Sequence, residues 1–109
     1  MSQNGIWGRF IRVMLPSASV TARRIADLTE ALTAHPDSAA LYLRRGEAYS
    51  EISEYGQAAD DFRRAARLAD EQFKTKSWGV VAQTVRDRAL RGLQQALAAA
   101  RAGNQGGNE

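Results

Sequence analysis

A chain of 109 residues is long enough for one small domain, and a second full domain is not expected. Its composition, 44% hydrophobic and 25% charged, is typical of a soluble globular domain and excludes a wholly disordered or collagen-like chain. Because it has no cysteine and a single histidine, it lacks the side chains for disulfides, thiol catalysis and the usual metal sites. We therefore expect no catalytic residue, no metal and no cofactor.

The net charge of +3 is unevenly distributed along the chain. Residues 1–26 contain four arginines and no acid, residues 27–71 contain ten acids against five arginines, and residues 72–109 contain six basic residues against two acids. Nucleic-acid binding needs basic residues clustered on one face, so this distribution argues against a nucleic-acid partner. No targeting signal and no apolar run of membrane-spanning length is evident, which favours a cytoplasmic protein.

Proline and glycine divide the sequence into five blocks in which apolar residues recur at helical spacing. The blocks cover residues 5–15, about 19–34, 38–52, 55–70 or a little beyond, and 77–101. No stretch shows the alternation of a strand, so the predicted fold is all-α, with four or five helices and a long C-terminal helix. The expected organisation is an amphipathic N-terminal helix at 1–16, a helical domain at 17–102 and a disordered tail at 103–109.

The third and fourth blocks together form a unit of about 34 residues in which large and small side chains stand at fixed positions. The seven positions are Tyr42, Gly46, Tyr49, Tyr55, Ala58, Phe62 and Ala65. Gly46 and Ala58 are small where the two helices of a hairpin would cross, and Ala65 is small where the next helix would approach. Tyr49 and Phe62 would fill the space beside the crossing. This unit closely resembles a tetratricopeptide repeat, which implies an array of helical hairpins.

Several residues depart from the pattern of that family. Arg45 replaces the usual leucine, Ser53 replaces the common turn glycine, and Asp70 stands where a closing proline would be. One period earlier, Pro36 resembles the closing proline of a degenerate half repeat. The last block does not match the repeat and resembles the cap helix that ends such arrays. One and a half repeats leave an apolar face uncovered, so we expect a homo-oligomer or a subunit of a larger complex.

The first helix of such a hairpin lines the groove that binds a peptide or helix of a partner. The resemblance places Ala40, Leu43, Glu47 and Ser50 in this groove. Some family members hold a terminal carboxylate with a lysine and an asparagine at the positions of Leu43 and Glu47, so that clamp is absent here. Glu47 would repel a carboxylate, which favours a basic or apolar peptide. The alternative is a groove filled by a neighbouring helix of the same chain, perhaps residues 77–101.

The first block has aromatic and aliphatic side chains on one side and arginines on the other. On a helical wheel the apolar side comprises Trp7, Phe10, Ile11, Val13 and Met14. Such a helix packs on the chain's own repeat, docks into a groove of a partner, or lies in a membrane interface. The sequence is compatible with each of these three arrangements.

Two groups of arginines stand on the later helices. Arg63, Arg64 and Arg67 have acids nearby and predict a solvated, ion-paired face rather than a phosphate site. A second group, Arg86, Arg88 and Arg91, is either a basic patch or a polar helix face. No nucleophile motif or phosphate loop occurs. The sequence therefore predicts a non-catalytic interaction module or scaffold; the rival is a peripheral subunit attached to a membrane or membrane complex through the first helix.

Overall fold

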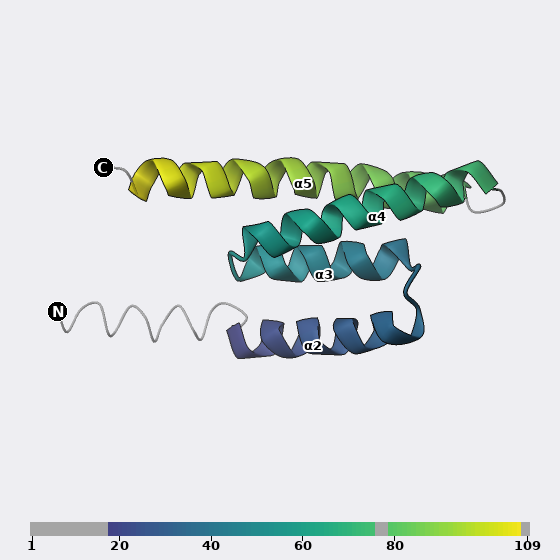
Figure 1. The fold of residues 1–109 in the computed structure, drawn as a ribbon, viewed down its shortest axis with the longest axis horizontal. Helices are drawn as coiled ribbons and strands as arrows, with labels where there is room; N and C mark the ends of the chain where they lie inside the picture. The colour runs from purple at the N-terminus through teal and green to yellow at the C-terminus, as the bar shows by residue number, and fades with distance from the viewer. Residues whose placement is uncertain (1–17, 76–78, 108–109) are drawn as a thin grey trace.

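A computed structural model describes residues 18–75 and 79–107 as four helices (Figure 1). They are α2 (Ala18–Ala34), α3 (Ala39–Glu51), α4 (Tyr55–Thr75) and α5 (Gly79–Gly107). No strand occurs among these residues, so the predicted all-α fold is confirmed, as is the long C-terminal helix. The block predicted at residues 5–15 lies outside the described residues.

The turns around α3 follow from local chemistry. Ser38 precedes the helix, and its hydroxyl oxygen accepts a hydrogen bond from the backbone N–H of Leu41 at 3.2 Å. After α3, Ser53 adopts a left-handed conformation with φ of 63°. This is the position where the repeat pattern has glycine, which reaches this conformation without the steric cost that a serine incurs.

Helices α4 and α5 both extend beyond their predicted ends. α4 continues to Thr75 because Asp70 does not stop a helix as proline would; its carboxylate pairs with Lys74 at 3.8 Å and with Arg86 of α5 at 3.6 Å. α5 continues to Gly107, past residue 101 where the last helix was predicted to end and into the segment predicted as a tail. Alanine-rich turns precede this end, and each added residue of a helix gains one backbone hydrogen bond. Residues 108–109 lie outside the described residues.

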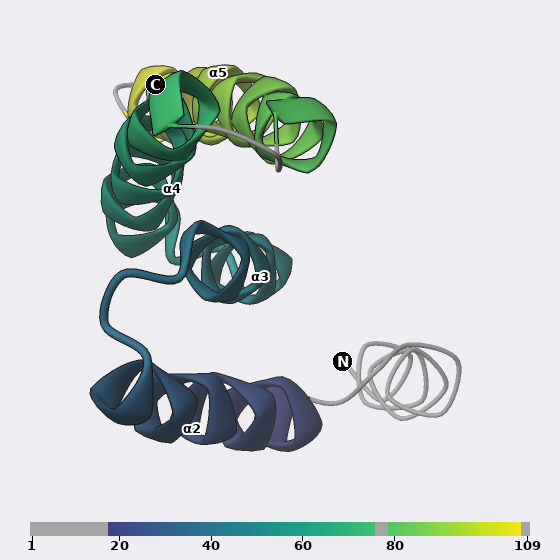
Figure 2. The same cartoon turned by 90° about the vertical axis from the view of Figure 1, so that its right-hand side faces the viewer.

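The helices stack in an array. α3 and α4 run antiparallel as a hairpin, α5 packs against both, and α2 contacts α3 alone among the described helices (Figure 1). In the view of Figure 2, α4 lies on the left, α5 runs across the top, and α3 lies below α5 and to the right of α4. α3 and α5 run in the same direction, so equivalent positions of the two helices lie at the same end of the molecule.

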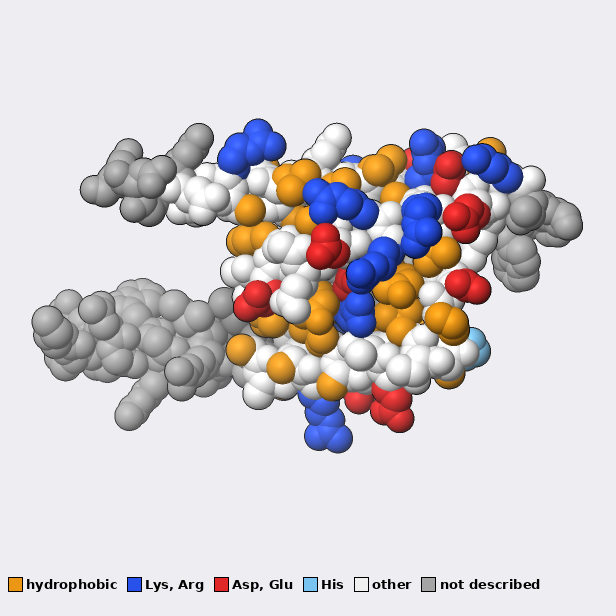
Figure 3. All heavy atoms as spheres, in the orientation of Figure 1, with side chains coloured by type: hydrophobic (Ala, Val, Ile, Leu, Met, Phe, Trp, Pro, Cys, Tyr) orange, Lys and Arg blue, Asp and Glu red, His pale blue; other side chains and the backbone are white. Residues whose placement is uncertain are grey.

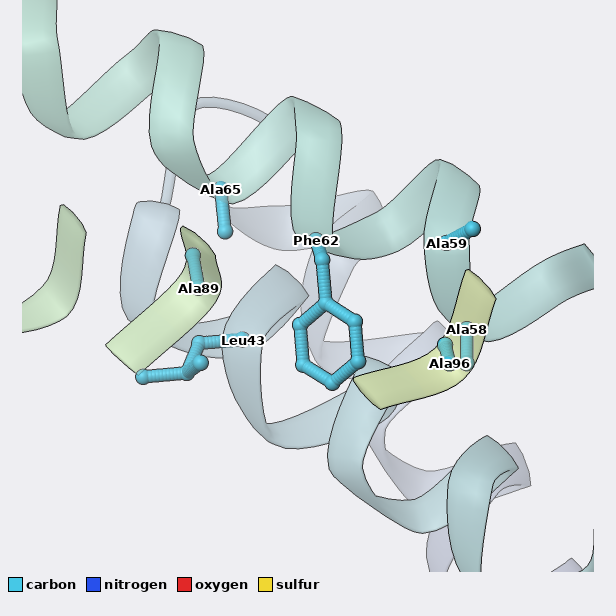
Figure 4. Close-up of a cluster of buried hydrophobic side chains, with 7 residues drawn as sticks. All are labelled: Leu43, Ala58, Ala59, Phe62, Ala65, Ala89 and Ala96. Atoms are coloured by element: carbon cyan, nitrogen blue, oxygen red, sulfur yellow. The ribbon is translucent and has the colours of Figure 1, made fainter. Parts of the chain in front are cut away.

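The core is centred on Phe62, whose exposed fraction is 2%. The other buried members of its cluster are Leu43, Ala58, Ala59, Ala65, Ala89 and Ala96 (Figure 4). The ring lies where three helices meet: a Cβ added to Gly46 of α3 would stand 2.9 Å from its Cε1 atom, and one added to Gly92 of α5 only 2.6 Å away. Ala65 points toward Ala89 of α5, so the small residue does lie where the next helix approaches. Gly46, Ala58, Phe62 and Ala65 thus lie in the helix contacts where they were expected, and Tyr49 packs partly buried against the cluster; Gly92 was not predicted.

Arg45, the departure from leucine, forms a buried ion pair. Its Nε donates to Asp61 Oδ2 at 2.7 Å and its Nη2 to Oδ1 at 2.8 Å, and the Asp61 side chain is 2% exposed. A further N–H donates to Thr29 Oγ1 of α2 at 3.2 Å. The guanidinium also lies over the rings of Tyr42 and Tyr49, at 5.5 and 5.8 Å from their centroids. The hydrogen bonds to Asp61 raise the pKa of Arg45 above its usual value, and the group links α2, α3 and α4.

Substitution of Gly92 by alanine tests the close approach of α5 to Phe62. A Cβ at 2.6 Å from the ring forces the helices apart, so we expect Gly92→Ala to lower the free energy of unfolding by about 1–3 kcal/mol. The matched control is Gly103→Ala in the same helix, where a Cβ meets nothing within 4 Å. Chemical denaturation measures both; equal stability of the two variants would contradict the packing described for Phe62.

Asp61 and Asp60 allow a test of the buried ion pair with adjacent residues. Asp61→Asn leaves the Arg45 charge without its partner, and we expect a loss of about 3 kcal/mol in the free energy of unfolding. The side chain of Asp60 is 64% exposed and pairs with Arg63 at 3.2 Å, so Asp60→Asn should cost less than about 0.5 kcal/mol. Thermal or urea unfolding gives both values, and a loss below about 1 kcal/mol for Asp61→Asn would refute the assigned role.

Candidate binding surface between helices α3 and α5

Two pockets open along the junction of α3 and α5, and α4 contributes to both. The first, named here the charged pocket, has a volume of about 330 Å³. Its lining residues are Glu47, Ser50, Phe62, Arg88, Arg91, Gly92 and Gln95. Gly92 has no side chain, so the pocket reaches down to the buried ring of Phe62 at its base.

The second pocket, named here the apolar pocket, has a volume of about 310 Å³. Its lining residues are Ser38, Ala39, Ala40, Gln72, Val81, Ala82 and Val85. Val81 is 57% exposed, and its neighbour Val80 is 80% exposed. Exposed aliphatic side chains beside a concave apolar wall are typical of a surface that another apolar group covers.

The electrostatics of the charged pocket are set by one ion pair. Arg88 of α5 donates to Glu47 Oε2 of α3 at 2.7 Å, so the carboxylate already has a partner. Arg91 takes part in none of the ion pairs formed among residues 18–75 and 79–107. The lining therefore carries one uncompensated positive charge, and the expectation that Glu47 would repel a carboxylate does not hold.

The predicted groove residues have three different outcomes. Ala40 is exposed and lines the apolar pocket, and Glu47 and Ser50 line the charged pocket. Leu43 is 2% exposed and belongs to the core cluster with Ala89 of α5, so its prediction as a groove residue is corrected. The physical reason is that α5 lies over this point, as the alternative of a groove filled by the last helix anticipated.

The α5 side of the junction was missed by sequence reasoning. Val81, Arg88 and Gln95 follow one another at intervals of seven residues, which places them on one face of α5. This spacing was visible in the sequence, but nothing there showed that the face lies against α3. Arg88 was predicted only as part of a basic patch or polar face with Arg86 and Arg91.

Other predicted surfaces lie elsewhere. The N-terminal docking residues Trp7, Phe10, Ile11 and Met14 are outside the described residues. Basic and acidic side chains are interspersed on the face where α4 lies in front (Figure 3). On α4, Arg63 pairs with Asp60 at 3.2 Å and Arg64 with Asp61 at 3.4 Å, so ion pairing is confirmed for these two arginines, whereas Arg67 forms none of the ion pairs among the described residues.

No helix in residues 18–75 and 79–107 has the length and apolar character needed to cross a membrane. Within the same residues, no three acidic or histidine side chains gather closely enough to hold a metal ion. Comparisons of the chain with protein-family models, with curated proteins and with solved structures found no match.

The Glu47–Arg88 pair should contribute little to stability, because both side chains are 40–49% exposed. A double-mutant cycle with Glu47→Gln and Arg88→Gln should give a coupling free energy of about 0.5 kcal/mol. At about 1 M salt, where screening acts over roughly 3 Å, the coupling should vanish. A coupling above about 2 kcal/mol would instead make the pair a structural clamp that closes the junction.

Proposed function

We propose that this protein is a non-catalytic interaction module whose binding surface is the α3–α5 junction, defined by the charged and apolar pockets. The observation that carries the proposal is the pair of pockets, which lie on one side of the same two helices. Each is concave, and together they combine exposed aliphatic side chains with arginine, serine and glutamine, the composition of a protein-binding surface.

Three observations support binding rather than chemistry. Among the described residues that line the charged pocket, Glu47 is the one carboxylate, and it is already paired with Arg88. The described residues that line the apolar pocket have aliphatic or neutral polar side chains. The hairpin packing also agrees with the resemblance to tetratricopeptide repeats, a family of interaction scaffolds. The proposal includes a cytoplasmic location, and an oligomer or larger complex, as the sequence predicts.

A matched pair of alanine substitutions tests the proposal. Ala40 is exposed at the apolar pocket, whereas Ala26 is exposed on α2, which contacts neither α4 nor α5. Ala40→Glu places a bulky charge in the pocket, and Ala26→Glu places the same charge outside it. We expect affinity purification from the native cell to recover a protein with the wild type and Ala26→Glu, and to lose it with Ala40→Glu.

Calorimetry with the purified partner then measures the loss of affinity, which should exceed tenfold because a charge would be buried against apolar groups. Circular dichroism must show that both variants keep the helical content of the wild type. Equal recovery of the same protein with Ala40→Glu and Ala26→Glu would refute the α3–α5 junction as the binding surface.

A further inference from the structure

The apolar and charged pockets are separated by about two helical turns along both α3 and α5. Ala40 and Glu47 on α3 are seven residues apart, and so are Val81 and Arg88 on α5. At a rise of 1.5 Å per residue, seven residues separate the pockets by about 10 Å. Because α3 and α5 run in the same direction, the apolar pocket lies at one end of the junction and the charged pocket at the other.

The chemistry of the two ends differs. At the apolar pocket, Val81 and Ala40 offer exposed apolar surface, which favours an aliphatic side chain. At the charged pocket, the Glu47 carboxylate is taken by Arg88 and Arg91 is left over, which favours a carboxylate. A partner that fits both ends therefore carries one apolar and one acidic group about 10 Å apart.

The apolar pocket favours a helix over an extended peptide. Val81, Ala82 and Val85 line it, and their side chains have no hydrogen-bonding group. An extended peptide would place unpaired backbone N–H and C=O groups against them, at a cost in free energy. A helix satisfies its own backbone and presents the side chains at i and i+7 on the same face.

From this geometry, and resting on the proposed function, we infer that the partner of the α3–α5 junction is an acidic amphipathic helix. It places an aliphatic side chain in the apolar pocket and, seven positions along, a carboxylate in the charged pocket. Arg91 is within reach of that position, because it follows Val85 of the apolar pocket by six residues, or about 9 Å along α5. The sequence favoured a basic or apolar peptide, whereas the proposed helix is acidic. The reason is that Arg88 neutralises Glu47, so the positive charge of Arg91 remains in the charged pocket.

Designed peptides test the inference on the full chain. The probes are fluorescein-labelled, alanine-based helical peptides of about 18 residues. One carries a leucine and, seven positions later, a glutamate; the second has lysine in place of the glutamate, and the third has glutamine in place of the leucine. Fluorescence anisotropy at low salt should show the leucine–glutamate peptide binding about fivefold more tightly than the lysine peptide and about tenfold more tightly than the glutamine peptide.

A charge-reversal variant separates a specific contact from a loss of folding. Arg91→Glu should reverse the order of the glutamate and lysine peptides, which a misfolded protein would not do. The control is Arg67→Glu on α4, an exposed arginine with no ion pair among the described residues, which should leave the order unchanged. Equal binding of the glutamate and lysine peptides, or the same preference in Arg91→Glu, would overturn the inference.

The oligomeric state decides between a partner helix and a second copy of this chain. Light scattering after size exclusion should give the same mass for the wild type and for Val81→Glu; a wild-type dimer that Val81→Glu converts to a monomer would overturn the inference. If Ala40→Glu abolishes capture of the native protein while the peptides show no preference, the interaction function stands and the acidic helix is wrong. If Ala40→Glu abolishes the capture of no protein, both the proposed interaction function and the acidic helical partner are wrong.

Discussion

The structure depends on the contact of one aromatic ring with two glycines. Phe62 of α4 lies between Gly46 of α3 and Gly92 of α5, at a depth where a single added carbon would collide with the ring. The rest of the cluster is largely alanine, so the helices approach closely and large side chains are few. Because protein interiors are close-packed, this approach fixes the distance between α3 and α5, and with it the width of the α3–α5 junction.

The buried pair of Arg45 and Asp61 performs a second task, because it connects α2 to this hairpin. Among the described helices, α2 contacts α3 alone, and the hydrogen bond from Arg45 to Thr29 joins α2 to the buried ion pair. An ion pair of this kind is costly to break but is a poor source of net stability, since both charges must leave water. Its bidentate geometry restricts how α3 and α4 can be placed relative to each other, which a leucine at this position would not do.

The α3–α5 junction follows from these two constraints. Parallel helices held at a fixed distance over α4 leave concave surface between them, apolar where valine and alanine face it and basic where arginine does. The weak, half-exposed pair of Glu47 and Arg88 crosses this surface without contributing to the core. The core residues Phe62 and Ala82 form part of the pocket walls, whereas the exposed residues Ala40, Val81 and Arg91 lie outside the buried clusters. Substitutions of these exposed residues are therefore expected to change the surface without unfolding the domain.

The sequence by itself determined the helices, the α3–α4 hairpin and the packing of Phe62 beside the small residues Gly46 and Ala58. Helical periodicity and the spacing of these small and large residues can be recognised within a short stretch of the chain. It also placed the turns at Pro36 and Ser53, although it ended α5 too early, since nothing in composition limits how far an alanine-rich helix propagates. Only the tertiary structure decided which face of α5 meets α3. That contact buried Leu43 and left Arg91 without an ion pair among the described residues. The sequence did not show this, because the electrostatics of a surface depend on pairs of residues far apart in the sequence.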